Sequence, residues 1–347
     1  MEKPKLSIVC VTYNHEKYIR AALDSFLSQK TNFAFEILIG DDASTDSTPD
    51  IIREYAEKYP DIIKPVLRQK NVGPGANSID LYNRVKTEYM AICDGDDYWT
   101  SPHKLQMQVD FLDNNKDYNI CFHPVECFFE NLPKSKHTFF PNKLTHPQVF
   151  AKPTLTLKDI AQGNFIQSSS VVYRWKFAAG LPAWYGTQIM PGDWCIMLLH
   201  ADTGHIKLIN ECMAVYRRHA SGIWWKISAS PIEYYNKYGL DILEIYKQID
   251  QYWDSKYTHL LRPILIGNLS YLILSYQNKA RQDGIEELRK YIATNLKNYN
   301  IPDDIFSRRN LYKTRLKLLM KRLLNNELLG LIKKLYFSTK FASKRSE

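Results

Sequence analysis

Apolar and polar segments alternate regularly over the first hundred residues of the chain. Residues 5–12 form a nearly continuous apolar run rich in β-branched side chains, which is typical of a strand buried on both faces. A helix follows, because apolar side chains then recur at helical spacing: Ile19, Ala22, Leu23, Phe26 and Leu27. The same reasoning predicts strands at 35–40, 63–67 and 89–93 and helices at 47–58 and 76–86. Strands alternating with helices indicate an α/β fold with a parallel sheet.

The pattern is less regular after residue 100. It predicts a helix over 104–114, strands over 119–123 and 168–173, an irregular proline-rich region to about 155, and a helix from Asp193 to His200. From about residue 232 the chain is predicted to be helical. We therefore expect three parts: an α/β domain over residues 1–225, a helical region over 226–310 and a tail over 311–347.

Polar or glycine-rich loops follow four of the predicted strands. They contain Tyr13-Asn14, Asp41-Asp42, Gly73 with Gly75, and Asp94 to Asp97. In an open parallel sheet the carboxyl ends of the strands share one edge, and ligands bind there. We therefore expect these loops to lie together at a ligand site.

Asp94, Asp96 and Asp97 place three carboxylates within four residues. Like charges this close are unfavourable unless a cation or full solvation compensates them. Mg²⁺ typically takes one or two carboxylates together with phosphate oxygens and water. The cluster is therefore compatible with metal-assisted handling of a diphosphate, and equally with an exposed acidic turn.

The net charge of +9 is concentrated in the tail. Residues 311–347 hold ten Lys or Arg and two acids, so the rest of the chain is nearly neutral and a nucleic-acid-binding body is not expected. Tyr312, Leu316, Leu319 and Leu323 form one stripe of a predicted helix, beside lysines. The tail fits a packed solvated helix, a nucleic-acid arm or a membrane-surface anchor, and a basic amphipathic helix favours an anionic bilayer.

The six cysteines form no C-x-x-C pair and show no zinc-ligand spacing. The amino terminus has no signal-peptide pattern, and the longest apolar stretch, 260–276, contains Arg262, Pro263 and Asn268. We expect a cytoplasmic protein, with possible peripheral contact at the cytoplasmic face of the membrane.

Four segments occur in the order and at the separations of a known family: residues 6–14, residues 36–46, Asp94 to Trp99, and Gly192-Asp193-Trp194. Together they resemble inverting glycosyltransferase family 2, whose GT-A fold is a Rossmann-like nucleotide-diphospho-sugar transferase domain. The resemblance covers roughly residues 5 to 222. It implies a sugar transferase of the hexosyl or N-acetylhexosaminyl class, acting from a UDP-sugar on a glycan or lipid-linked acceptor. The implied setting is bacterial surface polysaccharide biosynthesis.

The resemblance also implies roles for individual residues. Asp42 corresponds to the carboxylate that reads the base, Asp193 to the general base, and His219 to a histidine near the metal or diphosphate. The implied residues for a divalent metal, Mg²⁺ or Mn²⁺, are Asp96, Asp94 and His219. The remaining implied contacts are to the donor (Thr12, Tyr13, Asn14, Asp41, Gly73, Asp94 and Asp97) and to the acceptor (Trp99 and Trp194).

Each role has a simpler structural alternative. Asp193 also fits a helix N-cap, Asp42 a turn, His219 a surface position, and the tryptophans core packing. The sequence departs from the family where an arginine usually follows the glycine-rich loop, because residues 77–79 are Asn-Ser-Ile. Arg84, Arg217 and Arg218 are the candidate replacements.

Two other functions remain possible at this stage. A nucleotidyl- or phosphotransferase would use similar metal-diphosphate chemistry, but the first strand is followed by Tyr13-Asn14-His15 and not by a basic glycine-rich loop. A non-catalytic glycan-binding or scaffolding protein of the same fold is the other alternative.

Overall fold

The computed structural model describes residues 3–130, 132–133, 137–186, 192–222 and 231–323. The chain divides into two compact units, which are described separately. The first unit comprises residues 1–141, 152–160 and 164–222, and the second comprises 142–151, 161–163 and 223–347.

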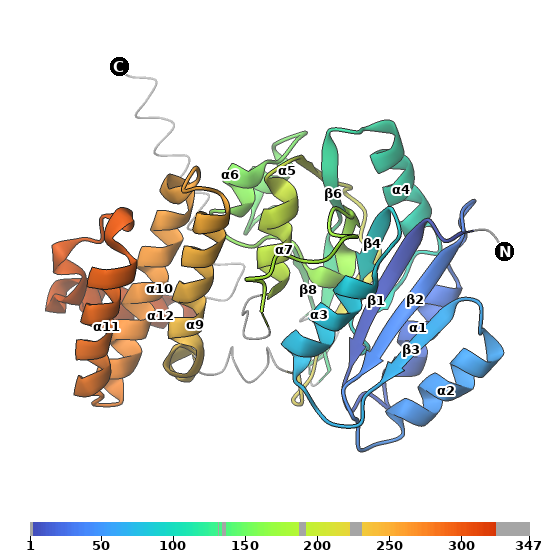
Figure 1. Ribbon diagram of the computed structural model, residues 1–347, viewed down its shortest axis with the longest axis horizontal. Coiled ribbons are helices and arrows are strands. Elements are labelled where there is room, and N and C mark those ends of the chain that lie inside the picture. The colour runs from blue at the N-terminus through green and yellow to red at the C-terminus, as the bar shows by residue number, and fades with distance from the viewer. Residues whose placement is uncertain (1–2, 131, 134–136, 187–191, 223–230, 324–347) are drawn as a thin grey trace. The chain divides into compact units, whose positions relative to one another are not determined.

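A seven-stranded sheet forms the centre of the first unit, with the strand order β10-β6-β9-β4-β1-β2-β3 (Figure 1). Its strands are β1 (Leu6–Thr12), β2 (Phe35–Asp41), β3 (Ile63–Leu67), β4 (Tyr89–Ile92), β6 (Tyr118–Phe122), β9 (Val172–Arg174) and β10 (His205–Leu208). The predicted parallel pairing is confirmed for β4, β1, β2 and β3. The sheet as a whole is mixed, because β9 runs antiparallel to both β4 and β6.

Helices cover both faces of this sheet: α1 (Ile19–Leu27), α2 (Thr48–Lys58), α3 (Pro74–Arg84) and α4 (Lys104–Asn114). On one face, side chains of β1 and β2 share a buried core with α1, α2 and α4. On the other, α3 approaches so closely that a Cβ on Gly40 would lie 2.5 Å from Asn77 Oδ1. Glycine at this position therefore sets the distance between α3 and the sheet.

A second, four-stranded sheet was not predicted. Its order is β5-β11-β7-β8, with β5 (Tyr98–Trp99), β11 (Ala214–Arg218), β7 (Val125–Phe129) and β8 (Thr138–Phe140). β5 directly follows the acidic cluster, and β11 pairs with it antiparallel. This pairing brings the residues after β11 back to the cluster, although they are more than a hundred positions away in the sequence.

The predicted strand over 168–173 is wrong in its first half. Ser168–Ser170 form a short 3₁₀ turn, and only Val172–Arg174 is a strand. The Gln167 side chain accepts hydrogen bonds from the backbone N–H and the hydroxyl of Ser169. Such local side-chain bonds compete with a sheet ladder, and they explain why the three serines turn.

The remaining helices of the first unit are short. They are α6 (Leu157–Ile160) and α7 (Gly192–Ala201). Helix α7 is almost wholly buried from Trp194 to Ala201, so it forms part of the core. It begins at the Gly-Asp-Trp segment, as predicted.

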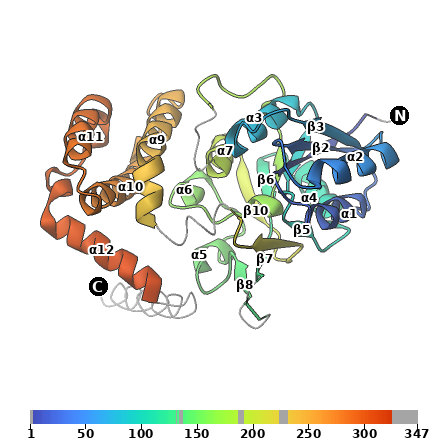
Figure 2. The ribbon, with the colours of Figure 1, turned by 90° about the horizontal axis from the view of Figure 1, so that it is seen from below.

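The described chain from residue 231 is helical, as predicted, with α9 (Pro231–Tyr252), α10 (Thr258–Asn278), α11 (Gln282–Asn295) and α12 (Arg308–Leu323). The second unit also contains the short helix α5 (Pro147–Phe150), from the region that was predicted to be irregular. Helix α10 contacts α9, α11 and α12, and Figure 2 shows α12 running along this group. The predicted tail is described only as far as residue 323, within α12. Among the described residues, none of the helices has the length and apolar character needed to cross a membrane.

Candidate active site

The loop between β1 and α1 is held by the loop between β2 and α2. Asn14 has a positive φ of 55°, and its backbone N–H donates to Ser44 Oγ over 2.8 Å. The backbone N–H of His15 donates to Thr48 Oγ1, also over 2.8 Å. These bonds fix the backbone of His15 at the carboxyl edge of the main sheet.

The acidic cluster forms a tight turn at the end of β4. The backbone N–H of Gly95 donates to Val11 O over 2.9 Å, and that of Asp97 donates to Asp94 O over 3.1 Å. A Cβ on Gly95 would lie 2.8 Å from the Thr12 side chain. Glycine between the acids therefore lets the turn lie directly against β1.

Arg217 fastens the same turn from β11. Its backbone N–H donates to Asp97 Oδ1 over 2.8 Å, and its Nε donates to Asp96 O over 2.9 Å. The guanidinium is surrounded by the rings of Tyr18, Tyr98 and Phe128, whose centroids are 4.8, 5.2 and 5.6 Å away. Cation–π contacts of this kind fix the arginine beside the acidic cluster.

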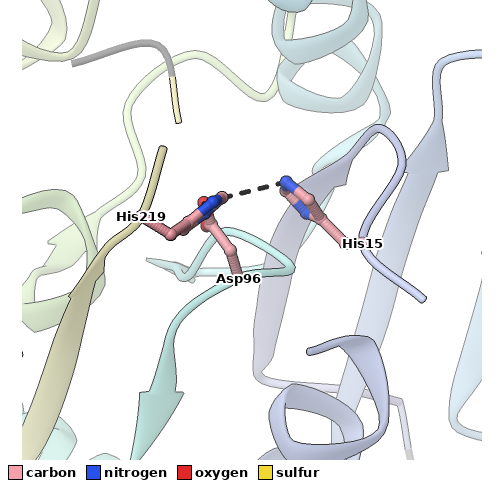
Figure 3. A group of neighbouring side chains, drawn as sticks. All are labelled: His15, Asp96 and His219. Atoms are coloured by element: carbon pink, nitrogen blue, oxygen red, sulfur yellow. Dashed lines mark hydrogen bonds and ion pairs between the residues drawn. The ribbon is translucent and has the colours of Figure 1, made fainter. Parts of the chain in front are cut away.

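Three side chains from separate segments point toward one another (Figure 3). His219 Nε2 lies 3.0 Å from Asp96 Oδ2, and His15 Nε2 lies 3.7 Å from the same oxygen. The three ligand atoms all lie within 4.8 Å of one another. We call His15, Asp96 and His219 the His-Asp-His cluster.

The spacing of the His-Asp-His cluster, within 4.8 Å, is close to that of ligand atoms around one divalent cation. With metal–ligand bonds of about 2.0–2.2 Å, ligand atoms around one ion lie roughly 3–4.4 Å apart. The Nδ1 of His219 lies 2.7 Å from Ser221 Oγ, which orients the ring so that Nε2 faces Asp96. Metal-binding histidines commonly have such a partner on their other nitrogen. The cluster contains Asp96 and His219, which were predicted as metal ligands. Its third member is His15, whereas Asp94 was predicted.

The three carboxyls of the turn titrate differently. Burial, together with the charges of Asp96 and Asp193, raises the pKa of Asp94 to about 8. Burial also raises the pKa of Asp97 well above its usual value. Burial acts in the same direction on Asp96, but the hydrogen bond and charge of His219 and the charge of His15 lower its pKa overall. Asp96 is therefore the carboxyl of the turn that is held ionised.

Asp193 lies in the first turn of α7 and is partly exposed. Burial raises its pKa, even though backbone N–H groups of the helix start lower it in part. Its charge also raises the pKa of Asp94, which places the two carboxyls in the same electrostatic environment. Asp193 is thus the second residue of α7 rather than its N-cap, and its raised pKa is compatible with the predicted role of base.

Asp42 is buried beneath the glycine-rich loop. Its Oδ1 accepts from Val72 N–H over 2.8 Å and its Oδ2 from Gly73 N–H over 2.9 Å. Each oxygen retains a second lone pair. Asp41 instead accepts from the backbone and hydroxyl of Ser44. Both aspartates therefore shape the loops, whereas Tyr13, 44% exposed, and Asn14 are the exposed residues among the predicted donor contacts.

The two predicted acceptor tryptophans are core side chains. Trp99 is 4% and Trp194 is 3% exposed. The Trp99 indole N–H donates to Ser169 O over 2.8 Å, and that of Trp194 donates to Ile160 O over 3.0 Å. Because both rings are buried with their polar edges satisfied, the structure favours packing over the predicted acceptor contact.

Sequence reasoning missed several residues at this edge. His15 was noted only as part of a loop, although a histidine just after a buried strand is a recognisable signal. Arg68, after β3, donates to Asn77 and Asp80 of α3, and Arg84 also pairs with Asp80. Among the three predicted replacement arginines, Arg217 is bonded to the acidic turn.

Comparisons with known proteins show what the chain is similar to. The model of the family described as glycosyl transferase family 2 matches residues 7–176. An uncharacterized protein from Mycobacterium tuberculosis is 39% identical over 270 residues, which are 78% of this chain and 74% of that protein. The poly(ribitol-phosphate) beta-glucosyltransferase of Bacillus spizizenii is 35% identical over 117 residues, 33% of this chain and 18% of that protein.

Two solved structures share the fold. Staphylococcus aureus TarS 1–349 in complex with UDP-GlcNAc has a TM-score of 0.50 at 19% identity, covering 94% of this chain and 89% of that one. The mannosyltransferase PcManGT from Pyrobaculum calidifontis, in complex with GDP-Man and Mn²⁺, has a TM-score of 0.50 at 17% identity, covering 92% and 88%. The chain belongs to glycosyl transferase family 2 and has a GT-A fold.

Proposed function

We propose that this glycosyltransferase transfers a hexosyl or N-acetylhexosaminyl group from a UDP-sugar to a hydroxyl of a glycan or lipid-linked acceptor, with inversion. Two neighbouring features carry the proposal. Asp96 is held ionised between two imidazoles, and Asp193 is a carboxyl group with a raised pKa. The first arrangement suits the diphosphate side of the reaction, and the second suits proton removal from the acceptor.

Asp96 and His219 would hold the divalent cation. When bound, such a cation supplies Lewis-acid stabilisation of the charge that develops on the leaving diphosphate. Arg217 keeps the acidic turn in place through Asp96 O and the carboxyl of Asp97. Asp97 is buried and has a raised pKa, so a protonated Asp97 would add no further negative charge near the diphosphate.

Asp193 is proposed as the general base. The acceptor hydroxyl must lose its proton as it attacks, and a carboxylate with a raised pKa is a better proton acceptor than an ordinary one. A single displacement of this kind inverts the anomeric centre. An α-linked nucleotide sugar would then give a β-linked product.

Uridine is the proposed base of the donor. Asp42 retains a lone pair on each carboxylate oxygen beyond the two loop N–H groups, and a carboxylate oxygen can accept a hydrogen bond from uracil N3–H. That TarS is known in complex with UDP-GlcNAc supports a uridine donor, whereas PcManGT in complex with GDP-Man is the reason to test guanosine as well.

We place the acceptor in surface polysaccharide assembly and helix α12 at an anionic membrane surface. Residues 308–323 carry seven Lys or Arg and no acid. Leu311 and Thr314 are buried, while Tyr312 is 67% and Leu316 is 45% exposed beside the exposed Lys313 and Lys317. An exposed aromatic and aliphatic pair among basic side chains is complementary to an anionic bilayer. A cytoplasmic face fits the free thiols of Cys10, Cys93, Cys121, Cys127, Cys195 and Cys212.

The test is a donor-hydrolysis and transfer assay with UDP-, GDP- and dTDP-sugars in the presence of Mn²⁺. We expect UDP release from at least one UDP-sugar, lost in Asp96→Ala. Turnover of GDP-sugars alone would contradict the uridine assignment. Nucleotide binding without turnover of any donor or acceptor would favour the non-catalytic alternative, which the intact acidic turn and Asp193 currently disfavour.

A further inference from the structure

His15 distinguishes this site from one built on the acidic turn alone. Its Nε2 lies 3.7 Å from Asp96 Oδ2 and completes a set of three ligand atoms within 4.8 Å. Its side chain is 16% exposed, and its Nδ1 is buried without a hydrogen-bond partner among the described residues. Neither nitrogen is therefore committed to holding the loop, and Nε2 faces the Asp96 carboxylate.

The loop presents His15 in a fixed position. Its backbone N–H is bonded to Thr48 Oγ1, and the flanking residues are also tied down: Glu16 N–H donates to Asp46, and Thr45 N–H donates to Asn14 Oδ1. Loops pinned in this way lose little further entropy when a ligand binds. This imidazole is thus preorganised toward Asp96, as is that of His219, which Ser221 orients.

The resulting ligand set differs chemically from a pair of carboxylates. Mg²⁺ is a hard cation that prefers oxygen ligands and retains water. Imidazole nitrogen suits first-row transition ions, and affinity for nitrogen sites rises from Mn²⁺ toward Zn²⁺. Two imidazoles and one carboxylate leave positions open for diphosphate oxygens and water.

We propose that His15 is a third protein ligand of the divalent cation, and that the His-Asp-His cluster selects a first-row transition ion such as Mn²⁺ over Mg²⁺. The inference rests on the proposed function for the role of the cation, but not for its binding. Asp94, in the same turn as Asp96, is not one of the three grouped ligand residues.

The experiment measures Mn²⁺ binding to the full chain without nucleotide, by electron paramagnetic resonance. Pulsed spectra count the imidazole nitrogens bound to Mn²⁺. We expect two in the wild type and one in either His15→Gln or His219→Gln. The control is His205→Gln, which changes a histidine on β10 whose side chain is 45% exposed. It should retain two bound imidazoles.

Affinity gives a second measure. We expect His15→Gln to weaken Mn²⁺ binding by at least about tenfold, the loss seen when even an outer-shell partner of a ligand is removed. A large excess of Mg²⁺ should displace Mn²⁺ from His15→Gln more readily than from the wild type. Melting temperatures of the metal-free proteins should agree, which separates ligand loss from misfolding.

The following results would contradict the proposal. One bound imidazole in the wild type, or unchanged Mn²⁺ binding in His15→Gln, would overturn the assignment of His15. Equal displacement by Mg²⁺ in both proteins would overturn the proposed selectivity. Neither result depends on sugar transfer. If the proposed function is wrong, the wild type should still bind Mn²⁺ but should show no turnover of UDP-sugars.

Discussion

Buried carboxyl groups are treated in opposite ways in the two units. In the helical unit, Asp250 is 3% exposed and accepts hydrogen bonds from the hydroxyls of Thr258 and Tyr299 over 2.7 and 2.9 Å. In the α/β unit, Asp94 and Asp97 are crowded by Asp96, and their pKa values rise. A buried acid with neutral donors stabilises a fold, whereas acids placed against one another need a cation or a reaction to explain them.

The largest expected effect compares Asp193→Asn with Asp250→Asn. The first removes the proposed base and should lower turnover by about 10²–10⁴-fold with little change in nucleotide affinity or melting temperature. The second should destabilise the helical unit and leave turnover per folded molecule unchanged. Steady-state rates, nucleotide binding and thermal melts check both variants.

Wild-type turnover should also depend on pH. The base must be deprotonated to act, so the raised pKa of Asp193 should move the acid limb of the rate profile above the pH at which an ordinary aspartate titrates. A wild-type acid limb at the ordinary aspartate position, or an equal loss of turnover in both variants, would contradict the functional contrast.

The second effect concerns stability. Among the described residues, a buried lysine occurs in the α/β unit and not in the helical unit. Lys104 is fully buried, its ammonium lies 4.2 Å from the Trp99 ring centroid, and its Nζ has no hydrogen-bond partner there. Burial lowers the pKa of Lys104 to about 7. Lys104→Met should therefore stabilise the protein by about 1–4 kcal/mol at neutral pH.

The sign of the pH dependence follows from proton binding. Between the folded pKa near 7 and the unfolded value near 10.4, the unfolded chain holds the extra proton, so wild-type stability gains up to about 1.4 kcal/mol per pH unit from this group. Lys104→Met lacks that gain. Urea unfolding at pH 7 and pH 9 measures it, and parallel shifts in both proteins would refute the buried, uncharged lysine.

A matched pair of glycines compares packing in the two units. A Cβ on Gly40 would lie 2.5 Å from Asn77 Oδ1 and 3.0 Å from Leu81, whereas Gly267 in α10 has nothing within 4 Å. We expect Gly40→Ala to cost about 1–3 kcal/mol of unfolding free energy. Gly267→Ala should add about 0.5–1 kcal/mol, because alanine favours a helix. A change in unfolding free energy with the same sign in both variants would contradict this contrast.

The smallest effect is expected on the surface of α12. Lys313→Glu with Lys317→Glu should leave turnover on a soluble acceptor unchanged. It should weaken the free energy of binding to phosphatidylserine vesicles, measured by co-sedimentation, by about 1 kcal/mol for each charge removed. The loss should be larger here because each charge is reversed and not only removed. The matched control is Lys30→Glu with Lys70→Glu, at two exposed lysines of the α/β unit. Equal losses in both pairs would indicate nonspecific attraction and not an α12 surface.

The local elements near the amino terminus were predictable because their signals are local. Continuous apolar runs gave β1 and β2, and helical spacing gave α1. The second sheet was not predictable in this way, because β5 has only two residues and its pairing with β11 joins segments far apart in the chain. Tertiary pairing, and not strand propensity, creates these strands.

The same reason explains the errors at the site. Sequence analysis grouped Asp94 and His219 with Asp96, and the fold places His219 and also His15 next to Asp96. Trp99 and Trp194 were predicted to contact the acceptor, with core packing as the alternative, and both side chains are buried. Motif spacing identifies which loops meet, but it does not tell which side chains face the ligand.

The central claim is that the carboxyl edge of the main sheet is a metal-dependent uridine diphosphate site. Calorimetric titration of UDP, GDP and dTDP, with and without Mn²⁺, into wild-type protein and Asp96→Ala tests it most directly. We expect tight UDP binding that requires Mn²⁺, is weaker for GDP and dTDP, and is abolished by the substitution. Metal-independent binding, or equal binding of all three nucleotides, would contradict the account.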